Sequence, residues 1–150
     1  MVIALERGRL FELVNQAYAD YTFALDANDA VVVAECFTPD GIWSISGREP
    51  LKGRADIAAF VEETAGDRPR HHYANLGLVE QGDQSVHSRA YFYLVSASDG
   101  AIVAYGEYAD ELVGNEEPAT RLQFVRRDIE FLWLQEAYAK RGRAGRSTES

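Results

Sequence analysis

Residues 70–78, RHHYANLGL, mark the place where the hydrophobic pattern of the chain changes its period. From here on, polar and apolar residues alternate, which is typical of strands with one buried face. Four such runs follow, over residues 70–80, 85–97, 101–113 and 120–134, and the turn-like links QGD, SASDG and GNEEPA join them. The second half of the chain therefore predicts four long antiparallel strands in a meander.

The first half of the chain has helical periodicity instead. Residues 5–27 and 54–65 carry apolar residues at intervals of three and four, and Asp29 fits the N-cap of a short helix in AVVVAECF. Between these helices we expect a turn at TPDG (38–41), a strand at IWSISG and a loop at GREPLKG. Helices followed by strands predict an α+β fold, in which a strongly curved sheet folds over the helices to form a cone with a pocket inside.

The composition fits one globular domain rather than a nucleic-acid or membrane protein. The chain has 150 residues, 47% of them hydrophobic, and a net charge of −9, whereas binding to phosphates needs an excess of Lys and Arg. No apolar run approaches the roughly 20 residues that span a bilayer. The single cysteine, Cys36, lies in an apolar run and is expected to be buried and inert. We expect a cytoplasmic protein with one domain over residues 1–136 and a disordered basic tail over residues 137–150.

Asp26 and His71 are the residues whose pairing would create a catalytic site. Asp26 follows the apolar stripe of the first predicted helix, and His71 begins a predicted strand. Strand alternation puts His71, Tyr73 and Asn75 on one face and His72 on the other. A carboxylate that accepts a hydrogen bond from one imidazole nitrogen fixes the tautomer and leaves the other nitrogen as a base. Taken alone, Asp26 fits an ordinary helix-end carboxylate better than a catalytic residue, and either histidine fits an ordinary hydrogen-bonded residue better.

The sequence does not predict a metal site or a bound cofactor. Zinc sites use three or four ligands at short, recognisable spacings, which His71, His72, His87 and Cys36 do not provide. The chain also has no GxGxxG motif, no P-loop and no GxSxG motif. We expect a small-molecule substrate and no cofactor.

Five segments in this order resemble the SnoaL-like family of the nuclear-transport-factor-like superfamily: YADYTFALDANDAVVVAECFTPDGIWSISG, LKGRADIAAF, RHHYANLGL, YGEYADEL and LQFVRRDI. The resemblance runs over roughly residues 10–132. It implies a cone-shaped α+β barrel, with three N-terminal helices packed in a strongly curved, mixed but mainly antiparallel sheet. It also implies a homodimer through the outer face of the sheet, or a higher homo-oligomer. The family includes scytalone dehydratase, hexachlorocyclohexane dehydrochlorinase and polyketide cyclases.

The resemblance also assigns roles to particular residues. In the dehydratase and the dehydrochlorinase, an Asp at the end of the first helix pairs with a His that opens a strand. Asp26 and His71 occupy these two places, and the spacing of four residues to Asn75 favours His71, although a shift of one residue to His72 stays open. These two residues are thus the candidate catalytic pair, and Asn75 is a candidate substrate-binding residue.

Four further residues are candidates for substrate binding. Trp43 matches a pocket tryptophan of the dehydrochlorinase, and Arg127 lies where the last strand of family members often carries an arginine. Tyr18 and Tyr73 are expected to shape the cavity, and a tyrosine hydroxyl that faces it can polarise a carbonyl.

The leading hypothesis is a cofactor-independent lyase or cyclase, of the dehydratase or aldol type, that acts on a small, largely apolar carbonyl or polyketide-like metabolite. His71 would abstract a proton, and Asp26 would orient it. One alternative is a non-catalytic accessory subunit, similar to the β subunits of ring-hydroxylating dioxygenases. A second is an epoxide hydrolase, which needs a second carboxylate and an arginine near the first carboxylate.

Overall fold

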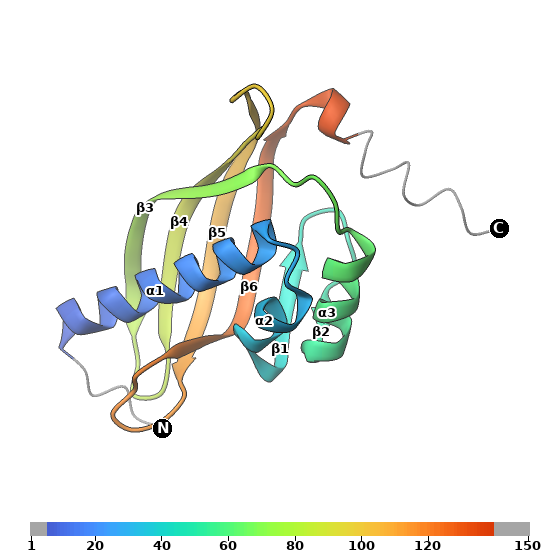
Figure 1. Ribbon diagram of the computed structural model, residues 1–150. Coiled ribbons are helices and arrows are strands. Elements are labelled where there is room, and N and C mark those ends of the chain that lie inside the picture. Colours follow the sequence, from blue (N-terminus) through green and yellow to red (C-terminus); the bar gives the residue numbers. More distant parts are fainter. Residues whose placement is uncertain (1–5, 140–150) are drawn as a thin grey trace.

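The computed structural model describes residues 6–139, and the basic segment 140–150 of the predicted tail lies outside this range. Three helices and six strands make up the fold (Figure 1). In chain order they are α1 (Arg7–Asp26), α2 (Ala30–Glu35), β1 (Phe37–Ile45), β2 (Leu51–Lys52), α3 (Gly53–Glu63), β3 (Arg70–Gln81), β4 (Val86–Val95), β5 (Ile102–Gly114) and β6 (Leu122–Leu134).

The six strands form one sheet in the order β2-β1-β6-β5-β4-β3. The strands β3 to β6 pair antiparallel with their neighbours in sequence, as the meander predicted. Strand β1 pairs parallel with β6, so the sheet is mixed. The predicted α+β class with a curved, mainly antiparallel sheet is thereby confirmed.

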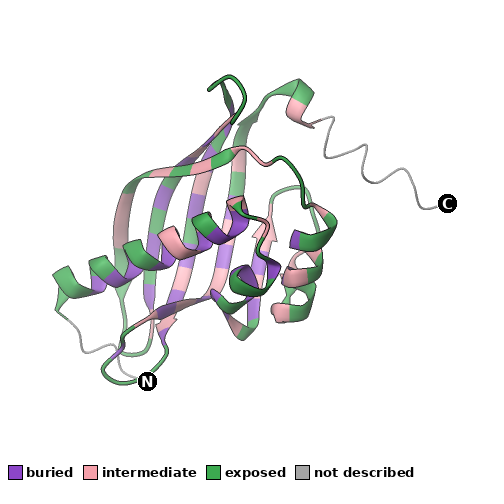
Figure 2. Cartoon of the chain, in the orientation of Figure 1, coloured by how far each residue is buried: buried purple, intermediate pink, exposed green. Residues whose placement is uncertain are grey.

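Helix α1 lies across the hollow face of the curved sheet (Figure 1). Its apolar stripe, which includes Leu10, Val14, Tyr18, Tyr21 and Leu25, is buried. Figure 2 shows that the buried side of α1 faces the strands and that its exposed side faces outward. This packing brings the last residue of the helix over the sheet.

The structure refines two local predictions about the first half of the chain. The predicted TPDG turn is a tight bend inside β1, at the irregular pairing with β6 between Phe37 and Ile42. The bend is tight because a Cβ atom on Gly41 would lie only 2.9 Å from Cβ of Phe37 and 3.1 Å from the backbone oxygen of Thr38. The GREPLKG loop contains the short strand β2, in which Leu51 pairs with Trp43. Asp29 does cap α2, since its carboxylate accepts a hydrogen bond from the backbone N–H of Val32 at 3.1 Å.

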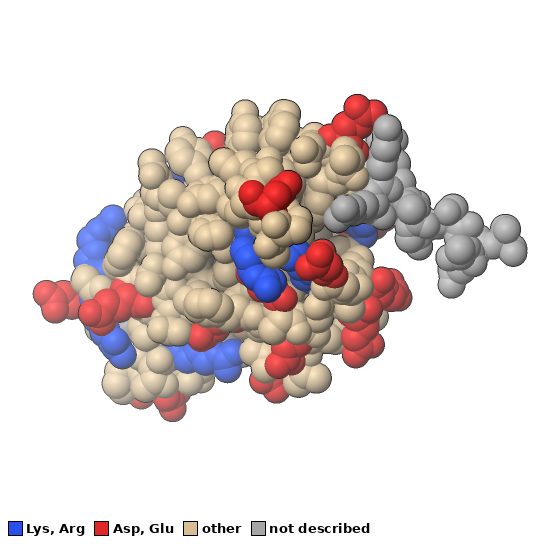
Figure 3. Space-filling view, turned by 45° about the horizontal axis from the view of Figure 1, so that its top comes forward, with Lys and Arg blue, Asp and Glu red and all other residues tan. Residues whose placement is uncertain are grey.

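The described surface carries scattered charges. On the face shown in Figure 3, basic side chains occur in small separate groups, with acidic and uncharged side chains between them. None of the helices within residues 6–139 is long and apolar enough to cross a membrane.

Candidate active site

Asp26 and His71 meet at the junction of α1 and β3. The Oδ1 atom of Asp26 lies 2.5 Å from Nδ1 of His71, and its Oδ2 atom accepts a hydrogen bond from the backbone N–H of His71 at 3.1 Å. The two side chains are only 11% and 14% exposed. An ionised carboxylate can only accept hydrogen bonds, so the contact selects the tautomer of a neutral His71 that carries its proton on Nδ1 and its lone pair on Nε2.

His71, and not His72, is the histidine on the inner face of the sheet. His72 stacks on Tyr93 with ring centroids 5.0 Å apart, and Tyr93 alternates along β4 with the buried Phe92 and Leu94. His72 therefore lies on the outer face. The structure resolves the one-residue ambiguity of the sequence in favour of His71.

Tyr73 and Asn75 lie in different surroundings, although strand alternation places them together. The ring of Tyr73 packs edge-on against the buried Tyr18, with centroids 5.1 Å apart, so Tyr73 faces the interior. Asn75 is exposed, has a positive φ of 56°, and lies where the pairing of β3 with β4 is irregular. The structure brings Tyr73 and Tyr18 together and leaves Asn75 outside this group.

A row of buried polar residues crosses the inner face of the sheet beside the aromatic cluster. Ser88 of β4 pairs in register with Asp110 of β5, Asp110 with Arg127 of β6, and Arg127 with Trp43 of β1. All four are buried, and the side chains of Asp110 and Arg127 are 0% exposed. The sequence predicted Trp43 and Arg127 as site residues, and the structure places them side by side.

Hydrogen bonds and one ion pair connect this row to α1. The hydroxyl of Tyr18 donates to Oδ2 of Asp110 and lies 3.1 Å from Oγ of Ser88. Because the hydroxyl has only one proton, Ser88 is the donor in the second contact. Oδ1 of Asp110 lies 3.4 Å from Nε of Arg127.

Aromatic rings surround the guanidinium of Arg127. Its central carbon lies between 3.8 and 4.6 Å from four ring centroids, those of Tyr108, Tyr21, Tyr18 and Phe124. Such contacts stabilise a cation through the negative faces of the rings. They cannot satisfy its N–H groups, which donate in the plane of the guanidinium.

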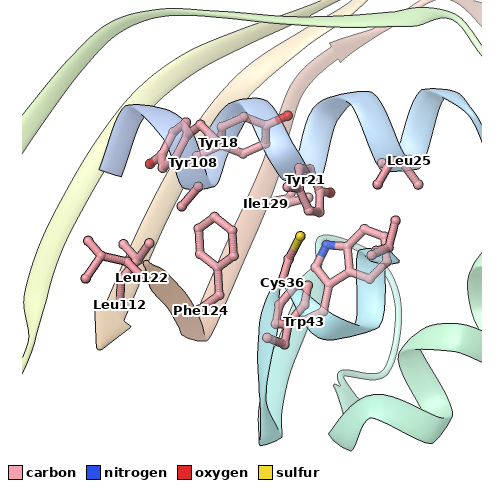
Figure 4. Close-up of a cluster of buried hydrophobic side chains, with 14 of the residues drawn as sticks. Tyr18, Tyr21, Leu25, Cys36, Trp43, Tyr108, Leu112, Leu122, Phe124 and Ile129 are labelled. Carbon is pink, nitrogen blue, oxygen red and sulfur yellow. The ribbon is translucent and has the colours of Figure 1, made fainter. Parts of the chain in front are cut away.

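Several buried donors in this region have no acceptor. Among the described side chains, all three nitrogens of Arg127, the hydroxyl of Tyr21 and Nε1 of Trp43 lack a hydrogen-bond partner. Figure 4 shows Tyr21 projecting from α1 above Trp43, with Cys36 next to the indole. Buried polar groups normally have partners, and each unpaired one has a cost of about 1–3 kcal/mol, so this cluster suits a ligand with acceptor oxygens.

The buried charges shift one another's titration. Burial raises the pKa of Asp110 to about 6, and the charge of Arg127 and the Tyr18 hydrogen bond only partly oppose this. Burial disfavours the charged form of Arg127, yet Asp110 and the tyrosines Tyr108, Tyr18 and Tyr21 together outweigh it and raise the pKa of this arginine. Burial also raises the pKa of Tyr18, Tyr21 and Tyr108, so these hydroxyls stay protonated at neutral pH.

A surface hollow lies close to the interior cluster. It has a volume of about 670 Å³ and is lined by Ile45, Gly47, Arg48, Glu49, Leu51, Phe60 and Glu63. The ring of Phe60 packs edge-on against Trp43, with centroids 5.3 Å apart. Phe60 thus separates the hollow from the unpaired indole N–H.

Within residues 6–139, no group of three or more His, Cys, Asp or Glu side chains is placed to hold a metal ion. The epoxide-hydrolase alternative needs an arginine near the first carboxylate, Asp26. In the structure the acidic partner of Arg127 is Asp110.

The sequence comparison identifies the family. A profile of the SnoaL-like domain matches residues 12–128. The chain belongs to this SnoaL-like family, and the resemblance seen in the sequence is confirmed. None of the curated proteins compared with the chain matches it.

Solved structures share the fold. A protein from Catenulispora acidiphila, in complex with S-DNPA, is 26% identical, with a TM-score of 0.73 and coverage of 92% of this chain and 99% of that one. ActVI-ORFA from Streptomyces coelicolor is 25% identical, with a TM-score of 0.70 and coverage of 82% and 97%. A candidate scytalone dehydratase from Novosphingobium aromaticivorans is 19% identical, with a TM-score of 0.68 and coverage of 83% and 85%, and shows the fold alone.

Asp110, Ser88, Tyr21 and Tyr108 are the site residues that the sequence analysis missed. A usable signal existed, because Asp110 alternates with Tyr108 and Leu112 along β5 and therefore falls on the buried face. An acid at such a position is seldom buried without a partner.

Proposed function

We propose that the protein is a cofactor-independent lyase or cyclase, in which Asp26 and His71 act together as a general base on a small, largely apolar carbonyl compound. The observation that carries this proposal is the double contact of Asp26 with the ring and the backbone of His71. It fixes the orientation of the imidazole and leaves Nε2 to accept a proton. A positioned base of this kind supplies about 10²–10⁴-fold in rate.

The proposed step begins with the transfer of one proton. A C–H bond next to the carbonyl breaks, and the proton forms an N–H bond at Nε2 of His71. The electron pair of the C–H bond forms a C=C bond, the π pair of the carbonyl moves onto its oxygen to give an enolate, and Asp26 stabilises the imidazolium. The enolate then re-forms the carbonyl and either expels a β-hydroxyl group, which leaves as water with the proton from Nε2, or attacks a second carbonyl, whose oxygen takes that proton; the first gives dehydration and the second cyclisation.

The unpaired interior donors support a role in binding the carbonyl oxygen. The two Nη groups of Arg127, the indole N–H of Trp43 and the hydroxyl of Tyr21 are buried and have no acceptor. Preorganised donors aimed at a developing oxyanion typically contribute more in a dry site than they do in water. The tyrosine and tryptophan rings favour a flat, apolar substrate body.

One similar structure supports a small-molecule ligand. The Catenulispora protein was solved in complex with S-DNPA. The proposal for this chain rests on its own geometry, and this neighbour agrees with a small-molecule ligand.

The proposal can be tested without knowing the natural substrate. In D₂O, the wild type should exchange the α-protons of 1-tetralone, a fused-ring ketone, faster than buffer does, as followed by ¹H NMR. His71→Gln and Asp26→Asn should lose about 10²–10⁴-fold of the excess rate. His72→Gln is the matched control, because its imidazole lies on the outer face, and it should exchange as the wild type does.

Two results would exclude His71 as the base: exchange by the wild type that is no faster than in buffer, or exchange by folded His71→Gln protein at the wild-type rate. Equal losses in the His71 and His72 variants would show a general effect on the strand and would also contradict the proposal.

A homodimer through the outer face of the sheet remains a proposal. Tyr91, Tyr105 and Trp133 are 44–48% exposed there, and large exposed apolar patches are typical of interfaces. Light scattering should give twice the chain mass, and Trp133→Asp should lower it to one chain. A single-chain mass for the wild type would contradict this proposal.

A further inference from the structure

Asp110 is a buried acid outside the candidate catalytic pair. The hydroxyl of Tyr18 donates a hydrogen bond to Oδ2 of its carboxylate, whereas Oδ1 has no hydrogen-bond partner and lies at ion-pair distance, 3.4 Å, from Nε of Arg127. Neither Asp110 nor Arg127 exposes any of its side chain to water. Asp110 is therefore the counter-ion of the only buried arginine among the described residues.

Asp110 lies on one side of the guanidinium only. None of the three nitrogens of Arg127 has a hydrogen-bond acceptor, but Asp110 forms an ion pair on the Nε side, whereas no carboxylate among the described residues forms an ion pair at Nη1 or Nη2. The four surrounding rings cover the guanidinium at 3.8–4.6 Å from its central carbon. A ligand oxygen that reaches the Nη groups must approach in the plane of the guanidinium, and there it would find two unpaired donors.

The charge of the pair limits which ligand can bind there. Asp110 and Arg127 together carry no net charge, so a neutral carbonyl oxygen can accept from the Nη groups without adding charge to the interior. A carboxylate would bring an uncompensated negative charge into a buried region, which is costly. The proposed proton transfer does not change the net charge of the site, because the negative enolate and the positive imidazolium form together.

We infer that Asp110 determines specificity: by neutralising Arg127 from its Nε side, it selects neutral carbonyl compounds over carboxylates at the Nη end. This inference rests on the proposed function, because it places the substrate carbonyl against Arg127. It adds the charge class of the substrate and the residue that sets it.

A matched pair of probes tests the inference by binding alone. 2-Naphthamide and 2-naphthoate have the same shape and differ in charge, and isothermal titration at pH 7.5 gives the ratio of their dissociation constants. The wild type should prefer the amide at least about tenfold. Asp110→Asn leaves Arg127 unneutralised and should shift the ratio toward the carboxylate by at least about tenfold.

Glu111→Gln is the control variant, because it removes the same charge from the adjacent residue, which pairs in register with Arg126. It should keep the wild-type ratio. An unchanged ratio in Asp110→Asn, an equal shift in both variants, or failure of the wild type to bind the amide would overturn the inference.

A pH comparison decides the question if Asp110→Asn does not fold. In His71→Gln protein, protonation of Asp110 at pH 5 should mimic the substitution and raise relative binding of the carboxylate at least about threefold over pH 7.5. The groups that act on Asp110 are Tyr18 from α1, and Arg127 and Asp128 from β6. Tyr18 and Arg127 keep their protonation over this range, and Asp128 is half-exposed and bonded to Arg126.

An unchanged ratio between the two pH values would overturn the inference. These readouts do not need turnover. If the wild type does not accelerate 1-tetralone exchange but still prefers the amide to the carboxylate, the proposed base is excluded and the inferred role of Asp110 in specificity is not affected.

Discussion

Replacing Arg127 by methionine should make the stability of the protein depend on pH between 6 and 8. Methionine fills a similar volume among the rings of Tyr108, Tyr21 and Phe124, but it leaves the carboxyl of Asp110 without its counter-ion. Removing one partner of a buried ion pair typically costs about 3–5 kcal/mol, because the other charge stays buried.

The sign of the pH effect follows from the titration of Asp110. In the wild type, burial raises its pKa from 3.8 to about 6. The folded state therefore binds this proton more tightly than the unfolded state does. The contribution of this proton to the free energy of unfolding is fully present below about pH 4 and is lost as the pH rises to 6. Above pH 6 the free energy of unfolding of the wild type does not change further on account of Asp110.

Arg127 lowers the pKa of Asp110, so its removal moves that pKa further above 6. The loss of stability then continues above pH 6, at up to about 1.4 kcal/mol for each pH unit until the new pKa is reached. Between pH 6 and 8, the free energy of unfolding of Arg127→Met should therefore fall by up to about 2.7 kcal/mol more than that of the wild type.

Urea unfolding, followed by circular dichroism at pH 6, 7 and 8, measures this difference. The double variant Asp110→Asn/Arg127→Met has no carboxyl at this position, and its stability should run parallel to that of the wild type. Parallel curves for the wild type and the single variant Arg127→Met would refute the electrostatic account of the row.

Three local features give further predictions. A Cβ atom on Gly106 would lie 1.9 Å from the backbone oxygen of Glu130, so Gly106→Ala should lose at least about 3 kcal/mol in urea unfolding. Gly8→Ala, which meets nothing within 4 Å, should gain about 0.5–1 kcal/mol, and equal effects would contradict this contrast. Asp29→Ala removes the cap of α2 and should cost about 1 kcal/mol; an unchanged urea midpoint would exclude the cap. Burial raises the pKa of Cys36 to about 11, so iodoacetamide at pH 8 should modify the native thiol about a hundredfold more slowly than the unfolded one, and fast native alkylation would contradict its burial.

The long elements could be predicted from the sequence because their periodicity is strong. The predicted helix over residues 5–27 corresponds to α1, and the four alternating runs correspond to β3 to β6. The bend at TPDG was predicted, but its place inside β1 was not, because the residues on either side of it pair with β6, more than 80 positions away. Local propensity carries no information on such distant pairing.

The candidate site was predictable in part. The ends of α1 and β3 predicted the placement of Asp26 and His71, and the contact between them is present. The contact of Arg127 with Asp110 was not predictable, because Arg126 and Arg127 are adjacent and the inward one depends on an irregular pairing between β5 and β6 at Glu111 and Leu112. Such irregularities leave little trace in a single sequence.

The position of β6 in the middle of the sheet has a consequence for how the chain is made. Among the described strands, β6 leaves the ribosome last, yet it separates β1 from β5 in the finished sheet. During synthesis, β1 therefore has its β2 neighbour but lacks β6 until the end. Its apolar side chains, Trp43 among them, stay accessible to chaperones and to other nascent chains in the meantime. We expect translation products that stop before residue 122 to aggregate or to be degraded.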